Sequence, residues 1–193
     1  MNKHTTRRLD LKPLSCELSQ NFPVLSRRIL RCAYRDISRF GFMKDAASLL
    51  LGFSGCEAIE LRTRQGDNYY RCWFSILPKP STKIEIISTQ QREALLDDSQ
   101  ISDYEWLCSY IYSGQFDPSQ YFFTRNGSYW TGDARIPQKI SLGDEDFREI
   151  SLDGDYKTLA IIPFVIDEGN FGLMIMKKLC KVELMSMKNR QSL

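Results

Sequence analysis

Histidine is almost absent from this chain of 193 residues, which contains only His4, close to the N-terminus. General-base catalysis, catalytic triads and many metal sites depend on histidine, because its ring titrates near neutral pH and its nitrogens bind metals. A lone histidine in an N-terminal segment removes most of these routes. We therefore expect no histidine-based catalytic site, and we predict that the chain is not an enzyme.

Closely spaced cysteines are also missing. Zinc sites, iron–sulfur clusters and disulfide scaffolds need cysteines in tight patterns such as CxxC. We therefore expect free thiols and no metal site, with redox sensing by one of them left open. The six cysteines are spread along the whole chain, at positions 16, 32, 56, 72, 108 and 180.

Long apolar runs do not occur either. The segment LAIIPFVI at 159–166 is among the longest, whereas a helix needs about 20 apolar residues to span a bilayer. The N-terminal residues 1–20 are basic but have no apolar stretch behind them, so no cleaved signal peptide is expected. We predict a cytoplasmic protein with no membrane partner.

The charge is distributed unevenly, since residues 1–39 carry +6 and residues 40–193 carry −4. A basic segment raises the question of nucleic-acid binding. The arginines in it recur at four-residue steps opposite an apolar stripe, which indicates a solvated helix face, and no aromatic platform for bases lies nearby. We expect no nucleic-acid partner. The arginines are Arg27, Arg31, Arg35 and Arg39, and the stripe is Leu30, Ala33, Ile37, Phe40, Ala47 and Leu51.

Three regions are predicted along the chain. Residues 1–26 form a tail, in which prolines interrupt any helix and Ser26 is placed as the N-cap of the helix after it. Residues 27–178 form one domain that opens with an amphipathic helix over 27–51, ended by glycines. Residues 179–193 form a short or truncated C-terminal helix.

Two strand pairs come after the helix. Segments 56–64 and 68–76 flank a Gln-Gly-Asp turn, and segments 158–165 and 170–178 flank a second turn. Because these strands are adjacent in sequence without helix crossovers, they predict an α+β fold with a central antiparallel sheet. We expect helices on one face of this sheet and a long loop-rich insertion, residues 78–147, over the other.

The insertion is expected to contain a short strand at 83–88 and a helix at 103–114. Its acidic segment at 143–147 lacks the ligand spacing of an EF-hand, so a solvated loop is predicted there. The strand at 68–76 alternates large side chains on both faces. Tyr70, Cys72, Phe74 and Ile76 share one face, and Tyr69, Arg71, Trp73 and Ser75 share the other.

The ordered set FSGCEAIELR, YYRC, FFTRNGSYWTGD and LAIIPFVIDEGNFGLMIMKK resembles the GAF domains of bacterial and archaeal sensor histidine kinases. The resemblance covers roughly residues 27–178. It implies an antiparallel sheet with helices on one face and, on the other, loops over a small-molecule pocket. It also implies a regulatory input module of a two-component signal transduction system. Since nothing after residue 178 resembles a kinase module, the output is expected from a partner, such as a histidine kinase or another output domain, or from a longer chain of which this sequence is one part.

Subfamily signatures do not identify a ligand. The NKFDE motif of cyclic-nucleotide GAF domains is absent, no cysteine is followed by the histidine of bilin-binding types, and the ACxRIP-type segment of free methionine sulfoxide reductases is missing. The ligand and any cofactor therefore stay unidentified. Two alternatives remain open: a thiol-dependent enzyme of the free methionine sulfoxide reductase type, and a dimerisation module with no ligand.

The candidate ligand-binding residues come from the strand at 68–76 and from the aromatic segment at 120–133. Aromatic and small side chains would line an apolar cavity, and polar ones would orient an anionic or polar ligand. The same aromatics could instead form a collapsed core beneath the insertion. The cavity residues are Tyr70, Cys72, Phe74, Phe123, Tyr129 and Trp130, and the polar ones are Arg125, Thr131 and Arg135.

A homodimer is also expected, through the predicted helix at 27–51. Ile29, Met43 and Leu50 broaden its apolar surface beyond the stripe. Shifts of packed helices at a subunit interface would then pass a binding event to an output.

Overall fold

The computed structural model describes residues 14–65, 68–76, 80–88, 101–143, 146–152, 156–167 and 170–179. The chain separates into two compact units, Met1–Phe53 and Ser54–Leu193. The first unit is helical and the second contains the sheet.

The first unit contains two helices, α1 (Leu14–Ala33) and α2 (Arg39–Ser54). The prediction of one helix over 27–51 was therefore wrong, because the chain leaves the helix after Ala33 and restarts after Ser38. Ser38 caps the second helix: its hydroxyl accepts from the Gly41 amide at 3.1 Å, and its carbonyl accepts from Phe42 at 2.9 Å. A serine at this position satisfies amides that have no partner inside the helix, which favours a new helix start.

The start of α1 also differs from the prediction. Ser26 lies inside α1 and is no N-cap, and the helix extends back to Leu14 through much of the predicted tail. Pro23 lies within this helix. Proline removes one backbone hydrogen bond from a helix interior, which is why it predicted a break there.

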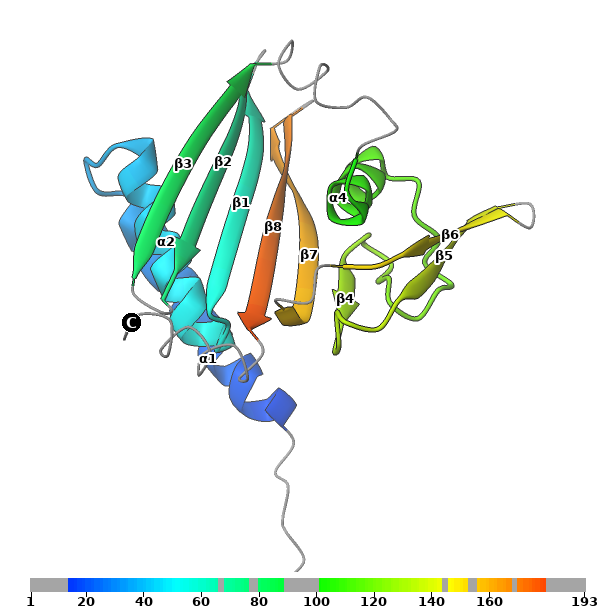
Figure 1. Cartoon of the computed structure of the whole chain (residues 1–193). Coiled ribbons are helices and arrows are strands. Elements are labelled where there is room, and N and C mark those ends of the chain that lie inside the picture. The colour runs from blue at the N-terminus through cyan, green and yellow to red at the C-terminus, as the bar shows by residue number, and fades with distance from the viewer. Residues whose placement is uncertain are drawn as a thin grey trace, which may run out of the picture. The chain divides into compact units, whose positions relative to one another are not determined.

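The second unit is built on a six-stranded, fully antiparallel sheet with the order β3-β2-β1-β8-β7-β4, shown in Figure 1. The predicted α+β class with a central antiparallel sheet is confirmed. The strands are β1 (Ala58–Gln65), β2 (Asn68–Ser75), β3 (Ser81–Ser88), β4 (Tyr129–Thr131), β7 (Tyr156–Asp167) and β8 (Asn170–Leu179).

Both predicted hairpins are present. β1 pairs with β2 up to the closing pair Gln65 and Asn68, and β7 pairs with β8 up to Asp167 and Asn170. β8 also pairs with β1, so the two hairpins join into one sheet. β8 extends to Leu179, and the rest of the predicted C-terminal helix lies outside the described residues.

The predicted insertion divides between the sheet and its cover. Its first strand, β3, pairs with β2 and so belongs to the sheet itself. Further on, β5 (Gln138–Gly143) and β6 (Asp146–Ile150) form a separate two-stranded sheet. The prediction of a solvated loop at 143–147 missed this strand pair, in which Gly143 has a φ of +98°.

The helix α4 (Asp103–Ser113) lies close to the prediction and contacts β7 and β8. The hydroxyl of Ser102 accepts from the Glu105 amide at 3.2 Å, and Gly114, with a φ of +73°, ends the helix in the left-handed conformation. These residues are a serine N-cap and a glycine C-cap.

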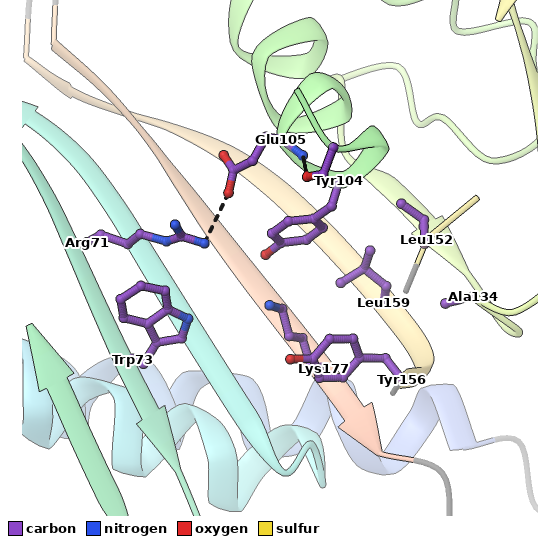
Figure 2. A pocket seen from close by; sticks show the side chains of 10 residues that line it. Arg71, Trp73, Tyr104, Glu105, Ala134, Leu152, Tyr156, Leu159 and Lys177 are labelled. Carbon is purple, nitrogen blue, oxygen red and sulfur yellow. Dashed lines mark hydrogen bonds and ion pairs between the residues drawn. The ribbon is translucent and has the colours of Figure 1, made fainter. Parts of the chain in front are cut away.

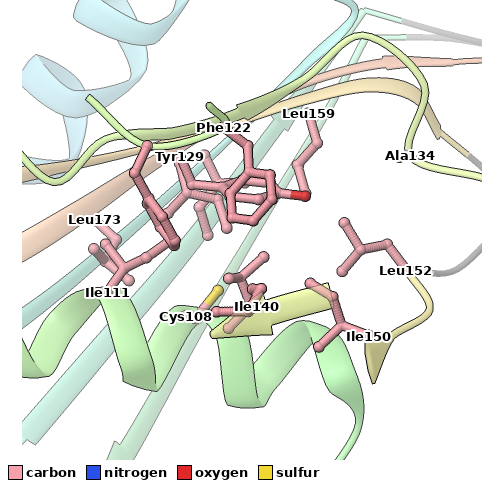
Figure 3. Close-up of a cluster of buried hydrophobic side chains, with 14 residues drawn as sticks. Cys108, Ile111, Phe122, Tyr129, Ala134, Ile140, Ile150, Leu152, Leu159 and Leu173 are labelled. Atoms are coloured by element: carbon pink, nitrogen blue, oxygen red, sulfur yellow. The ribbon is translucent and has the colours of Figure 1, made fainter. Parts of the chain in front are cut away.

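The main core of this unit lies between α4, β5, β6 and the sheet (Figure 3). Apolar residues recur on one face of α4 and at alternate positions of β7 and β8, so these surfaces pack together. The cluster comprises Leu107, Cys108, Ile111, Phe122, Phe123, Tyr129, Ala134, Ile140, Ile150, Leu152, Leu159, Ile161, Leu173 and Ile175.

Candidate functional site

A pocket of about 310 Å³ opens on the same sheet face, beside the N-terminal end of α4 (Figure 2). The sheet contributes residues of β2, β7 and β8, and the cover contributes the start of α4 and two segments that flank the β5–β6 hairpin. The lining residues are Arg71, Trp73, Ser102, Tyr104, Glu105, Ala134, Leu152, Tyr156, Leu159 and Lys177.

Glu60 of β1 lies at the centre of the charged residues around this pocket and is fully buried. One oxygen accepts from the Nε of Arg62 at 2.7 Å and from the Nε of Arg71 at 2.5 Å. The other accepts from the hydroxyl of Tyr104 at 2.8 Å and from the Nζ of Lys177 at 3.0 Å. Burial alone would raise the pKa of Glu60, but these surrounding charges outweigh it and lower the pKa to about 2.

Glu105 joins α4 to the sheet. Its carboxylate accepts two hydrogen bonds from Arg62, at 2.6 and 2.9 Å, and forms an ion pair with the Nη2 of Arg71 at 3.1 Å. Ser102 and Glu105 have the spacing of a capping box, in which the glutamate would turn back to the start of its own helix. Here the Glu105 carboxylate binds arginines of β1 and β2 instead. The glutamate of the Ser-x-x-Glu pattern therefore holds α4 against the sheet.

Lys177 of β8 is 5% exposed and lies between two aromatic rings. Its Nζ is 4.4 Å from the ring centroid of Tyr104 and 4.6 Å from that of Tyr156. Burial lowers the pKa of Lys177 despite the opposing charge of Glu60. The rings favour the ammonium form through their negative faces.

The site has a surplus of positive charge among its described residues. Three cations, Arg62, Arg71 and Lys177, surround the two carboxylates of Glu60 and Glu105. The Arg71 guanidinium also stacks on an aromatic ring, with its Cζ 4.2 Å from the centroid of Trp73.

The pocket is divided into a charged end and an apolar end. In Figure 2, Arg71 and Glu105 lie on one side, Leu152 and Ala134 lie on the opposite side, and Lys177 lies between them. A ligand that fits both ends would itself have one charged or polar end and one apolar end.

Three of the sequence-predicted residues lie on the opposite face of the sheet. Arg71 and Trp73 line the pocket, and because neighbouring residues of a strand point to opposite faces, Tyr70, Cys72 and Phe74 point away from it. Cys72 and Phe74 are buried there.

Three others contribute to the core. Phe123 and Tyr129 are buried in the cluster of Figure 3, as the core interpretation of the aromatic segment implies. The Tyr129 hydroxyl donates to the Gln138 side chain at 2.7 Å, and Gln138 donates to the Thr131 hydroxyl at 2.8 Å. This buried chain of hydrogen bonds satisfies its polar atoms internally.

The remaining three predicted residues are exposed and line no part of the pocket. Arg125 lies in a turn, and Trp130 is 52% exposed on β4. Arg135 pairs with Asp133 at the surface, where this arginine lowers the pKa of Asp133 to about 2.

Sequence reasoning missed most of the residues that surround the pocket. A usable signal existed in β1, where Glu60 and Arg62 alternate with apolar residues, and in Lys177, which ends an apolar alternation in β8. Charged residues at alternate strand positions mark one face, and the hairpin register then places Arg62 opposite Arg71.

No cysteine is among the described residues that line this pocket. Cys32, Cys56, Cys72 and Cys108 are free. Burial raises the pKa of Cys108 to about 12. Among the residues that the structure describes, no three His, Cys, Asp or Glu side chains gather as metal ligands, and no helix is long and apolar enough to cross a membrane.

Comparison with solved structures finds matches that include GAF domains. The A. aeolicus Nlh2 GAF domain in an inactive state is 12% identical with a TM-score of 0.43, and 88% of each chain is covered. The phycoerythrobilin-bound GAF domain from a cyanobacterial phytochrome is 13% identical with a TM-score of 0.46, covering 88% of this chain and 90% of its own. Both belong to the family that the sequence resembles. No family model matches the chain, and no curated protein matches it significantly.

Proposed function

We propose that this chain is a regulatory sensor domain that binds a small molecule in the pocket between the sheet and α4. The observation that carries the proposal is a metabolite-sized pocket whose charged side chains are held in place by the buried carboxylate of Glu60. Small-molecule sites commonly range from about 300 to 1,000 Å³ and combine apolar walls with a few fixed polar groups. The pocket has both features.

The proposed signal starts at α4. Glu105 and Tyr104 of this helix contact the arginines and the glutamate of the sheet. A ligand that competes for Arg71 would change how firmly Glu105 is held, and with it the position of α4. A two-component output partner, a cytoplasmic location and a homodimer through the segment 27–51 stay predictions.

The two alternatives have less support. A thiol-dependent reductase needs at least two cysteines near its pocket, because one thiol must resolve the sulfenic acid formed on the other. The lining residues include no cysteine. A dimerisation module with no ligand has no need for a cationic pocket of this size.

A thermal-shift screen tests the proposal, with a library that includes anionic, neutral and cationic metabolites. We expect at least one compound to raise the unfolding temperature of the wild-type chain in a concentration-dependent way. Ala134 lines the pocket and is 1% exposed, so Ala134→Met would partly fill it and weaken that shift. Ile136→Met, at an exposed site two residues away, is the matched control.

The unfolding temperatures of both variants are measured first without ligand, so that a folding defect is recognised. If no compound of any charge stabilises the wild-type chain, the proposal fails and the dimerisation module becomes the better interpretation. A shift that Ala134→Met leaves unchanged would place binding elsewhere.

A further inference from the structure

We infer that the pocket binds an organic monocarboxylate with a short apolar body, its carboxylate at Arg71 and Lys177 and its body against Ala134, Leu152 and Leu159. This inference rests on the proposed function and specifies its ligand class. It is drawn from the arrangement of donors and apolar side chains in Figure 2.

The negative charge of the ligand is inferred from the hydrogen bonds around the pocket. Both oxygens of Glu60 are already used by four donors, and both oxygens of Glu105 accept from arginine. Arg71 has five N–H groups, and its contacts with Glu60 and Glu105 use Nε and Nη2. The protein thus supplies more donors than these two carboxylates accept, and an anion would use the remainder.

The charge balance points the same way. Among the described residues of the site, three buried or half-buried cations face two carboxylates, which leaves a surplus of one positive charge. Removing a charge from water is costly unless it is paired. Burial lowers the pKa of Lys177 even though its Nζ donates to Glu60 at 3.0 Å, so a further carboxylate nearby would favour its charged form. A single carboxylate would balance the group.

The apolar end limits the rest of the ligand. Leu152 and Leu159 are at most 9% exposed, and Ala134 is buried beside them. These three side chains belong to the core and line the pocket with apolar surface, so a second charge on the ligand would be desolvated against them. The volume of about 310 Å³ lies at the small end of ligand pockets, so the body must be compact.

Calorimetry with matched probe pairs tests this inference on the full chain. The carboxylates are benzoate, phenylacetate and hexanoate, and each is compared with its neutral amide and with inorganic phosphate at equal ionic strength. We expect at least one carboxylate to bind at least tenfold more tightly than its amide and than phosphate. Arg71→Gln should weaken that carboxylate at least tenfold. Arg135→Gln removes one exposed positive charge outside the pocket and should leave affinity unchanged.

The possible outcomes separate the two proposals. Amides that bind as tightly as their carboxylates, or phosphate that binds best, would overturn the inference and leave a sensor for another ligand class. The same conclusion holds if Arg135→Gln weakens binding as much as Arg71→Gln does. If no carboxylate binds, the inference fails, and the broader thermal-shift library then decides separately whether the chain is a sensor. If Arg71→Gln does not fold, Leu152→Asn at the apolar end is the second variant. It should weaken binding of the same carboxylate at least tenfold.

Discussion

Arg62 of β1 and Glu105 of α4 lie 43 residues apart in the sequence and form a two-pronged ion pair, with Nη1 to Oε2 at 2.6 Å and Nη2 to Oε1 at 2.9 Å. The same arginine donates from Nε to Glu60 at 2.7 Å. One side chain therefore connects the buried carboxylate of the sheet to the helix that covers it. The planar guanidinium suits this position because its donors have a fixed geometry.

Arg62→Lys keeps the charge but removes this geometry, since an ammonium cannot engage both carboxylates in the same way. We expect the free energy of unfolding to fall by about 1.5 to 3 kcal/mol, the range for hydrogen bonds to charged groups. Arg64→Lys, at the next exposed position on the same face of β1, should change it by less than about 0.5 kcal/mol. Denaturant unfolding measures both, and equal losses would contradict the assigned role of Arg62.

The pKa of Glu60, lowered to about 2 from an ordinary value of 4.5, predicts a pH dependence of stability. A carboxylate with a lowered pKa in the folded state stabilises the fold fully above its unfolded pKa, and that contribution is lost as the pH falls from about 4.5 towards 2. Glu60→Gln should lose about 3 to 5 kcal/mol at pH 7, because the surrounding cations lose their partner. The free energy of unfolding of Glu60→Gln should also fall less steeply between pH 4.5 and pH 3 than that of the wild-type chain.

Urea unfolding between pH 7 and pH 3 measures this dependence. Glu149→Gln, an exposed carboxylate of β6, is the control and should keep the wild-type slope. If Glu60→Gln does not fold, carboxyl NMR of the wild-type chain replaces it. A Glu60 signal that titrates near pH 4.5 would refute the prediction.

Gly172 of β8 is required by close packing. A Cβ at this position would lie 2.5 Å from the Cζ of Phe164 and 2.9 Å from the backbone oxygen of Arg62. The backbone oxygen cannot move aside as a flexible side chain can, so Gly172→Ala should cost about 1 to 3 kcal/mol. Gly132→Ala has nothing within 4 Å and should be close to neutral. Thermal unfolding of the two variants measures this difference. If Gly172→Ala is as stable as the wild-type chain, the close contact of residue 172 with Phe164 and the backbone of Arg62 is contradicted.

Cys108 should resist thiol reagents in the folded chain, because it is 2% exposed and burial raises its pKa to about 12. Cys56 is half-buried and should react before it. Timed labelling at pH 8 followed by peptide mass spectrometry measures the order. Faster labelling of Cys108, or turnover of free methionine sulfoxide that disappears on Cys→Ser substitution, would instead favour the thiol-dependent enzyme.

The homodimer was predicted through the segment 27–51, whose first residues, including Leu30, lie in α1 and can be tested there. Phe22, Val24 and Leu30 of this helix are each more than half exposed, at 59%, 53% and 56%. Light scattering should give twice the 22.5 kDa chain mass at micromolar concentration. Leu30→Glu should shift it to the monomer, whereas Leu142→Glu, at a leucine 48% exposed on β5, should not. A wild-type monomer would remove the dimer from the proposal.

Local sequence patterns were sufficient for several elements. The turn residues between 64 and 68 and the alternation on both sides predicted the β1–β2 hairpin, and α4 was predicted to within one residue of its end. The break between α1 and α2 was missed because the apolar stripe continues across it, although Ser38 was available as a cap. The apolar periodicity over residues 27–51 was given more weight than the one capping residue, Ser38, so one continuous helix was predicted.

What the sequence by itself determined is which side chains share a face of each strand, because the alternation of a β-strand is local and fixed by backbone geometry. Alternation alone separates Tyr70, Cys72 and Phe74 from Arg71 and Trp73. It could not determine which face α4 would cover. That choice depends on contacts such as Arg62 with Glu105 and Lys177 with Glu60, between residues 43 and 117 positions apart. Only tertiary packing brings such groups together. The strand pattern shows that Arg71 and Trp73 share a face, and the packing of α4 makes that face the wall of the pocket.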